Sequence, residues 1–145
     1  MTVREAKRDE LLQILSLYLH LHETDIPAGD AHLWQTWERI LADENYHLIV
    51  CEWDGEIVSS CVCVVIPNLT RNVRPYALIE NVVTAQAYRG RGCATACLDF
   101  ARELARQNGC YKLMLMTGAK DESTLAFYRR AGFSDADKTA FVQWL

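Results

Sequence analysis

The chain has 145 residues and a formal net charge of −4; half of its residues are hydrophobic and 23% are charged. This composition is typical of a compact globular protein and excludes a disordered one, and the length predicts one domain, residues 1–145. The acidic balance argues against a nucleic-acid-binding protein, which relies on a basic face. No apolar run reaches the ~18 residues of a membrane span, and the start lacks the apolar core of a signal peptide, so we expect a cytoplasmic protein with no membrane partner.

Six cysteines occur in the chain. In the reducing cytoplasm we expect them to remain free thiols packed inside strands and helices. Cys93 and Cys97 share a helix face, but no Cys-x-x-Cys pair is present to complete a tetrahedral site. His20 and His22 are two residues apart on a predicted helix, so their side chains diverge. We therefore expect no metal.

The first part of the chain predicts a short strand and two amphipathic helices. The strand covers residues 2–6. From Arg8 to His22, apolar residues recur at spacings of three and four, which predicts a helix, and Pro27 then breaks the pattern. Asp30 is a good N-cap for a second helix. The apolar face of this second helix is Leu33, Trp34, Trp37, Ile40 and Leu41.

A β-hairpin is predicted next. Residues 46–53 form its first strand, Asp54-Gly55 is a strong turn signal, and residues 56–66 form its second strand. The second strand is almost continuously apolar, as expected when both of its faces are covered. Residues 67–75 read as a loop.

The stretch from Leu78 to Arg106 predicts a strand, a tight glycine turn and a helix. Residues 78–84 are rich in β-branched and apolar residues, and helical spacing begins after Gly90 and Gly92. A helix that begins there points its unpaired N–H groups and its positive dipole end into the turn, where an anion is the natural occupant. The spacing fits neither a P-loop nor a G-x-G-x-x-G dinucleotide motif.

The last part predicts a strand over residues 110–117 and a short helix over residues 123–130. The strand, helix and strand around the glycine turn read as a right-handed parallel crossover. Residues 133–137 and 139–145 are expected to form a final hairpin-like extension.

Two motifs resemble the GNAT N-acetyltransferase superfamily. Arg89-x-x-Gly92-x-Ala94 follows a strand as in the family's acetyl-CoA signature, and Phe127-Tyr128-x-x-x-Gly132-Phe133 matches its second signature. The resemblance covers essentially the whole chain. It implies an α+β fold with a mixed, largely antiparallel central sheet, a splayed parallel strand pair and flanking helices.

The resemblance implies acetyl-CoA as cosubstrate and places its binding residues. The pantetheine arm would pair with the backbone of Val82, Val83 and Thr84. Asp121 stands where many members have an asparagine; it can cap the following helix but cannot donate a hydrogen bond when ionised. The diphosphate would be held by the main-chain N–H groups of Arg89, Gly90, Arg91, Gly92, Cys93, Ala94 and Thr95.

Two residues are candidates for the chemistry. Tyr128 occupies the family's tyrosine position, where the hydroxyl protonates the departing thiolate; the alternative is a packed aromatic that only shapes the site. Glu80 is the candidate base, since burial would raise its pKa toward the operating pH, where a general base is most effective. It is equally a candidate anion that binds a cationic amine or pairs with an arginine such as Arg74. A main-chain N–H near Val83 would stabilise the oxyanion.

By the same resemblance, the first two helices and their connection form one wall of the acceptor pocket. Asn81 is a further acceptor candidate, because it could orient a water or a polar group of the substrate. The alternative for the helical residues is that the tryptophans anchor the core and the acids are solvated. The candidates in the helical wall are Tyr18, His22, Glu23, Asp25, Trp34 and Trp37.

The sequence thus predicts an acetyl-CoA-dependent N-acetyltransferase that acts by direct attack of a primary amine, with a small-molecule acceptor preferred. The alternatives are a non-catalytic CoA-binding module and a protein N-terminal or lysine acetyltransferase. A homodimer is compatible with the resemblance, and the apolar segment 141–145 is a candidate contact.

Overall fold

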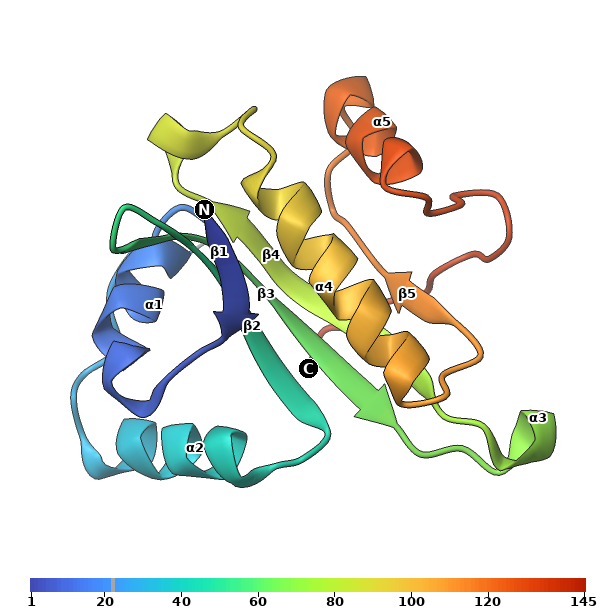
Figure 1. Cartoon of the computed structure of the whole chain (residues 1–145), viewed down its shortest axis with the longest axis horizontal. Helices are drawn as coiled ribbons and strands as arrows, with labels where there is room; N and C mark the ends of the chain where they lie inside the picture. Colours follow the sequence, from blue (N-terminus) through green and yellow to red (C-terminus); the bar gives the residue numbers. More distant parts are fainter. Residues whose placement is uncertain (22) are drawn as a thin grey trace.

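The computed structural model describes residues 1–21 and 23–145 and is built on one five-stranded sheet in the order β1-β2-β3-β4-β5 (Figure 1). Neighbouring strands are antiparallel except β4 and β5, which are parallel. The predicted α+β fold with a mixed, largely antiparallel sheet is confirmed. The strands are β1 (Thr2–Glu5), β2 (Tyr46–Trp53), β3 (Glu56–Ile66), β4 (Tyr76–Thr84) and β5 (Leu113–Leu115).

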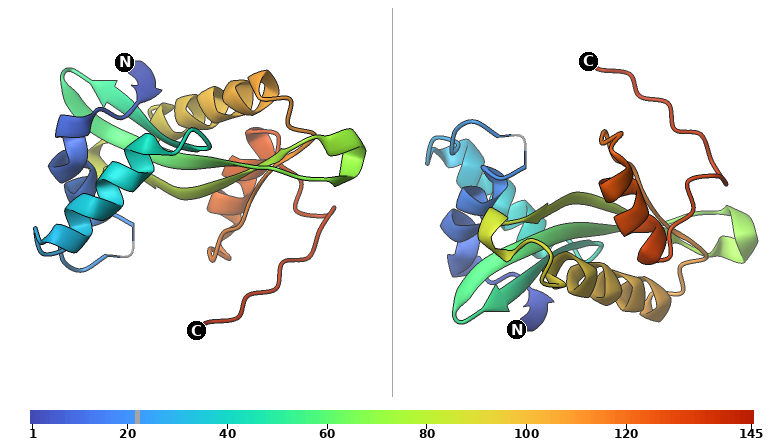
Figure 2. Two further views of the ribbon diagram at one scale, coloured as in Figure 1. Left: turned by 90° about the horizontal axis from the view of Figure 1, so that it is seen from below. Right: turned by 90° about the horizontal axis from the view of Figure 1, so that it is seen from above.

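Helices cover both faces of the sheet (Figure 2). α1 and α2 lie on one face and α4 on the other, with α5 beside α4 and β5. Asp30 caps α2 as predicted, because its carboxylate accepts from the Leu33 N–H at 3.0 Å. The helical segments are η1 (Arg8–Glu10), α1 (Leu11–Tyr18), α2 (Ala31–Ala42), α3 (Thr70–Val73), η2 (Gln86–Tyr88), α4 (Cys93–Gln107) and α5 (Glu122–Arg130).

The alternation of side chains along β2 divides the core in two. Ile49 and Cys51 point into the core under α4, whereas Leu48 and Val50 point into the core under α1 and α2. Leu98 of α4 is 1% exposed, and burying a side chain of this size contributes about 1.5–3 kcal/mol. The sheet is therefore fixed from both faces, which makes it a rigid support for β4.

β4 separates from β5 part-way along its length. The parallel pairing runs from Ala77 with Leu113 to Ile79 with Leu115 and goes no further, so residues 80–84 have no partner in β5. On its other edge β4 has a bulge, because Val62 pairs with Glu80 but Ser60 pairs with Val83. Asn81 lies in the bulge at φ 52°. The predicted splayed parallel pair is confirmed, and the opening begins at Glu80.

The predictions for the chain after β4 need two corrections. The strand predicted over residues 110–117 is shorter, since only Leu113–Leu115 is a strand. The hairpin-like extension predicted after residue 132 is wrong, because no residue from 133 to 145 lies in a strand. Arg129 binds the Asp135 carboxylate at 2.7 Å, which holds this segment beside α5 and away from the sheet.

Candidate active site

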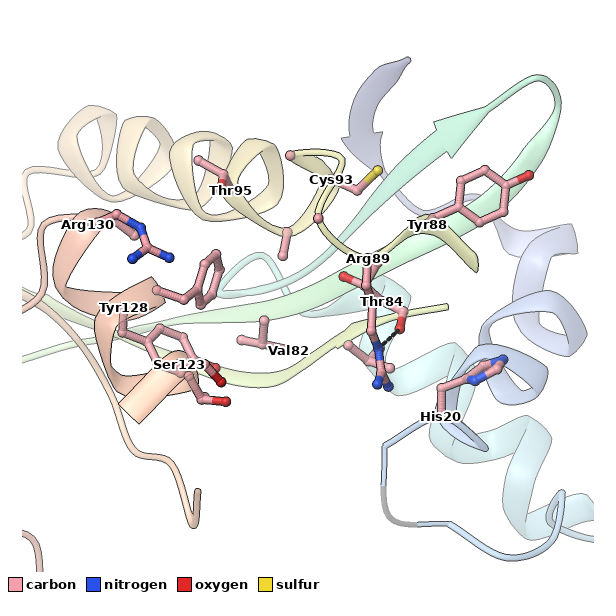
Figure 3. Close-up of a pocket in the computed structure, with 17 residues that line it drawn as sticks. His20, Val82, Thr84, Tyr88, Arg89, Cys93, Thr95, Ser123, Tyr128 and Arg130 are labelled. Atoms are coloured by element: carbon pink, nitrogen blue, oxygen red, sulfur yellow. Dashed lines mark hydrogen bonds between the residues drawn. The ribbon is translucent and has the colours of Figure 1, made fainter. Parts of the chain in front are cut away.

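A cavity of about 750 Å³ lies where the unpaired end of β4, the glycine turn and α5 meet. Figure 3 shows Ser123 and Tyr128 of α5 across from Val82 of β4, with His20 and Arg89 at the other end. Of the residues predicted for cofactor binding, the structure places these ten on the cavity wall: Val82, Val83, Thr84, Arg89, Gly90, Gly92, Cys93, Ala94, Thr95 and Tyr128.

The glycine turn presents main-chain donors to this cavity. Gly90 and Gly92 have φ angles of 73° and 84°, in the left-handed region that residues with a Cβ avoid. Gly92 precedes the first turn of α4 and provides no side-chain cap. No hydrogen bond within the described part of the chain uses the N–H groups of residues 90–95. With the positive end of the α4 dipole, these donors form a site suited to a diphosphate.

The two arginines of the turn differ. The Arg89 side chain lines the cavity, and its Nε donates to the Thr84 carbonyl at 3.3 Å. The Arg89 main-chain N–H donates to the Gln86 carbonyl at 3.3 Å, so the free donors begin only at residue 90. The Arg91 guanidinium lies 5.9 Å from the Trp53 ring and 5.4 Å from the Tyr88 ring. This stacking holds the Arg91 side chain off the cavity wall.

β3 holds the free end of β4 in place. The buried Ser59 hydroxyl donates to the Val83 carbonyl at 2.8 Å and lies 2.8 Å from the Thr84 hydroxyl. The Ala85 N–H donates to the Val58 carbonyl at 2.8 Å. Because one edge of the β4 end is bound to β3, only the edge facing the opening is available to a ligand.

The Asp121 carboxylate is hydrogen-bonded to the first turn of α5. Its carboxylate accepts from the Thr124 N–H at 2.9 Å and from the Ser123 hydroxyl at 2.6 Å. These bonds, the Ser123 hydroxyl first, lower the pKa of Asp121 to about 2. Asp121 is therefore an N-cap, as its sequence position indicated, and Ser123 and Thr124 face the cavity in its place.

Tyr128 is held in an aromatic cluster under the cavity. Its ring centroid is 5.0 Å from that of Phe127 and 6.4 Å from that of Phe133, and it packs on the core under α4. Burial raises the pKa of Tyr128 above its ordinary value, and the neighbouring Cys61 adds to this. The phenol therefore carries its proton at neutral pH.

Glu80 and Asn81 lie on the other face of the sheet. Glu80 pairs with Val62, which belongs to the core under α1, and directly paired residues point to the same face. Neither residue lines the cavity, but both lie where β4 has left β5. The opening between the two strands therefore separates Glu80 from Tyr128.

The predicted helical wall is only partly available to an acceptor. Trp37 is 2% exposed and its Nε1 donates to the Arg8 carbonyl at 2.9 Å, so it is a core anchor. Trp34 is 45% exposed, and Glu23 and Asp25 are also exposed. Tyr18 is half-buried at the end of α1. His22 lies outside the described residues.

Several residues of the cavity were not predicted. Ser123 and Thr124 carry a signal in the sequence, since hydroxyls after an N-cap aspartate lie in a first helical turn. The others lie next to predicted residues in the chain, except His20, which comes from a distant segment and whose local pattern gave no sign of a place on this wall. They are His20, Tyr88, Phe127, Arg130 and Ala131.

All six cysteines are free thiols, and five of them are buried, as expected from the composition. Among the described residues, no group of three or more His, Cys, Asp or Glu side chains is arranged to hold a metal ion. The described helices include none with the length and apolar character needed to cross a bilayer.

Residues 9–133 match the family model described as Acetyltransferase (GNAT) family. The chain belongs to this family. A putative acetyltransferase from Agrobacterium tumefaciens str. C58 has a similar structure, with a TM-score of 0.91 and 34% identity over 99% of this chain and 100% of that one. A Trypanosoma brucei acetyltransferase gives a TM-score of 0.82 and 28% identity, with 99% of each chain covered.

The sequence relatives are longer than the matched region. An uncharacterised N-acetyltransferase of Methanocaldococcus jannaschii is 28% identical over 99% of this chain, which spans 64% of that protein. The glucosamine 6-phosphate N-acetyltransferase of Trypanosoma brucei brucei is 38% identical over 54% of this chain and 52% of its own length. The GNAT family is one of acetyltransferases, and the glycine turn of this member lies where the sequence motif predicted.

Proposed function

We propose that this GNAT protein transfers an acetyl group from acetyl-CoA to a primary amine of a small molecule in the cytoplasm. The observation that carries the proposal is the meeting of three features in one cavity: the free N–H groups of residues 90–95, the free edge of β4, and the Tyr128 phenol.

The cavity suits the two ends of the donor. A diphosphate fits the start of α4, where main-chain N–H groups and the helix dipole point at one place. A peptide-like arm fits the free edge of residues 82–84, which can accept an added strand. When bound, acetyl-CoA supplies an activated thioester carbonyl.

The residues around the opening have complementary roles. A main-chain N–H near Val83 stabilises negative charge on the carbonyl oxygen as the amine nitrogen attacks. As the carbon–sulfur bond breaks, the Tyr128 hydroxyl gives its proton to the sulfur, and the amine loses a proton to solvent. The raised pKa of Tyr128 keeps the proton available until this step.

A small-molecule acceptor is supported by relatives rather than by a ligand in this structure. The Trypanosoma relative is named for glucosamine 6-phosphate, and a Bacillus subtilis relative with 38% identity over 46% of this chain is named streptothricin acetyltransferase A. The rival function is a CoA-binding module without catalysis, in which Tyr128 only packs.

The test is acetyl-CoA turnover against a panel of amines, with mass analysis of the product, alongside calorimetric titration of CoA. We expect CoA to bind. We also expect the product to be heavier than the free amine by roughly 42 Da, the net mass that an acetyl group adds when it replaces a hydrogen. Binding without turnover across the panel would support the rival module. Absence of CoA binding would refute the proposal altogether.

A further inference from the structure

We infer that the acceptor carries a second positive charge, and that Glu80 binds this charge. The inference rests on the proposed acetyl transfer and specifies the class of amine: a diamine or polyamine rather than a phosphorylated or carboxylated amine.

A group of polar side chains near the opening has no role in the proposed chemistry. We name it the Glu80 cluster: Glu80, Asn81, Tyr18, Tyr46 and Ser60. All five come together on the α1 side of the sheet, around the bulge of β4. The Tyr18 phenol lies close to Ser60 and Asn81, and Tyr46 lies close to both Tyr18 and Glu80. Four separate elements thus converge on one point.

Ser60 is the member of the cluster whose hydrogen bonding is incomplete. Its side chain is fully buried, at 0% exposure, yet its Oγ has no hydrogen-bond partner of normal geometry in the described structure. The Tyr18 hydroxyl is close enough to interact with it, but without the geometry of a normal hydrogen bond. A buried hydroxyl left without a partner costs about 1–3 kcal/mol, so a polar ligand group at this point would remove a penalty.

The charge of the cluster is negative. Glu80 is its only charged member, it is half-buried, and the ion pairs of the described residues leave its carboxylate without a partner. Tyr18 and Tyr46 stand beside it, and aromatic faces attract cations. A carboxylate flanked by phenol rings and hydroxyls is chemistry that binds an ammonium group and repels a phosphate.

The segment between α1 and α2 is also negatively charged. Between Arg8 and Arg39 the chain contains no Lys or Arg. Glu23 and Asp25, which are exposed, follow shortly after His20, which lines the cavity. Of the two arginines on the cavity wall, Arg130 belongs to α5, and Arg89 belongs to the glycine turn and donates to the Thr84 carbonyl. Between Arg8 and Arg39, the described part of the chain therefore offers an anionic acceptor no lysine or arginine.

The cluster is placed to hold the far end of an acceptor. Pairing between β4 and β5 stops at Ile79, immediately before Glu80, so the opening that leads to the Tyr128 side begins at this carboxylate. One amine can extend into the opening while a second ammonium stays against Glu80. Glu80 then anchors the acceptor and does not act as the base. These are the two roles that the sequence left open for it.

The experiment compares 1,4-diaminobutane with 1-aminobutane, which differ by one ammonium group. Binding to the CoA-loaded protein is measured by calorimetry, and kcat and KM are measured by acetyl-CoA turnover. We expect the wild-type protein to favour the diamine by about tenfold or more in Kd and KM, a preference that weakens with added salt. Glu80→Gln should abolish the preference through KM, with kcat for the diamine changed by less than about threefold.

The matched control is Glu103→Gln, which removes the same charge from the exposed face of α4. It should leave the preference intact. Ser60→Ala provides a second variant: removing the unpartnered hydroxyl should weaken diamine binding while the thermal midpoint holds or rises.

The inference is overturned if Glu80→Gln lowers kcat equally for both amines and removes the acidic limb of the pH–rate profile, because Glu80 is then the base. It is also overturned if glucosamine 6-phosphate binds better than glucosamine. Calorimetry gives the binding comparisons, between the two butylamines and between the two glucosamines, without turnover, so failure of the acetyl-transfer proposal and failure of this inference are distinguishable.

Discussion

The glycine turn follows the free end of β4, the Glu80 cluster surrounds the bulge of β4, and the two are built from different atoms. The turn offers main-chain N–H groups, and one of its two arginines stacks away from the cavity on Trp53 and Tyr88. The cluster offers side chains from four elements, including a buried hydroxyl without a partner. In the proposed function, the donor side therefore depends on backbone shape, whereas the acceptor side and the chemistry depend on side-chain identity.

The largest effect is expected when a single oxygen, that of the Tyr128 phenol, is removed. Tyr128→Phe should lower kcat by about 10²- to 10⁴-fold, the usual contribution of a general acid. CoA affinity should hold, because the ring still packs on Phe127 and Phe133. In the wild type, burial raises the pKa of Tyr128, so loss of activity through its deprotonation should occur at higher pH than for an ordinary phenol.

The measurements for Tyr128 are single-turnover rates across pH and CoA titration by calorimetry. Tyr111→Phe, which removes a hydroxyl from the distant Tyr76–Tyr111 pair, is the control and should be near wild type. A Tyr128→Phe protein with wild-type kcat would show that the phenol has only a packing role.

A smaller effect is expected from a change of backbone shape on the donor side. Gly92→Ala introduces a Cβ at φ 84°, and the left-handed conformation costs such a residue about 1–2 kcal/mol. If the turn relaxes in the free protein, CoA binding must restore it, so the Kd should rise by roughly tenfold. Gly29→Ala is the matched control, since Gly29 has open space and no left-handed φ. Equal affinity for CoA in both variants would contradict main-chain recognition.

The smallest effect is expected for Arg91, a charged residue of the glycine turn whose side chain stacks on aromatic rings outside the cavity. Arg91→Ala should change the Kd for CoA by less than about threefold and cost about 0.5–1 kcal/mol of stability, the value of an exposed cation–π contact. Arg89→Ala should weaken CoA binding more, because Arg89 lines the cavity. Calorimetry and thermal unfolding of both variants measure this, and the reverse order would show that Arg91 leaves its stack to bind the ligand.

The fold was largely predictable because its signals are local. Alternation and the Asp54-Gly55 turn located the β2–β3 hairpin, and the change of period at Gly92 located the start of α4. The prediction was wrong for the last residues, where a hairpin-like extension was expected over residues 133–137 and 139–145. There a contact between Arg129 and Asp135 holds the preceding segment beside α5, and no local pattern reveals such a contact.

The sequence by itself determined the family, the order of the elements and the anion-binding turn, because glycine spacing constrains the backbone wherever it occurs. Only the tertiary structure decided which side chains meet. It buried Trp37, turned Arg91 onto Trp53, and brought Tyr18 of α1 beside Ser60 of β3. These encounters depend on strand register and on the bulge at Asn81, which are set by packing across the whole sheet.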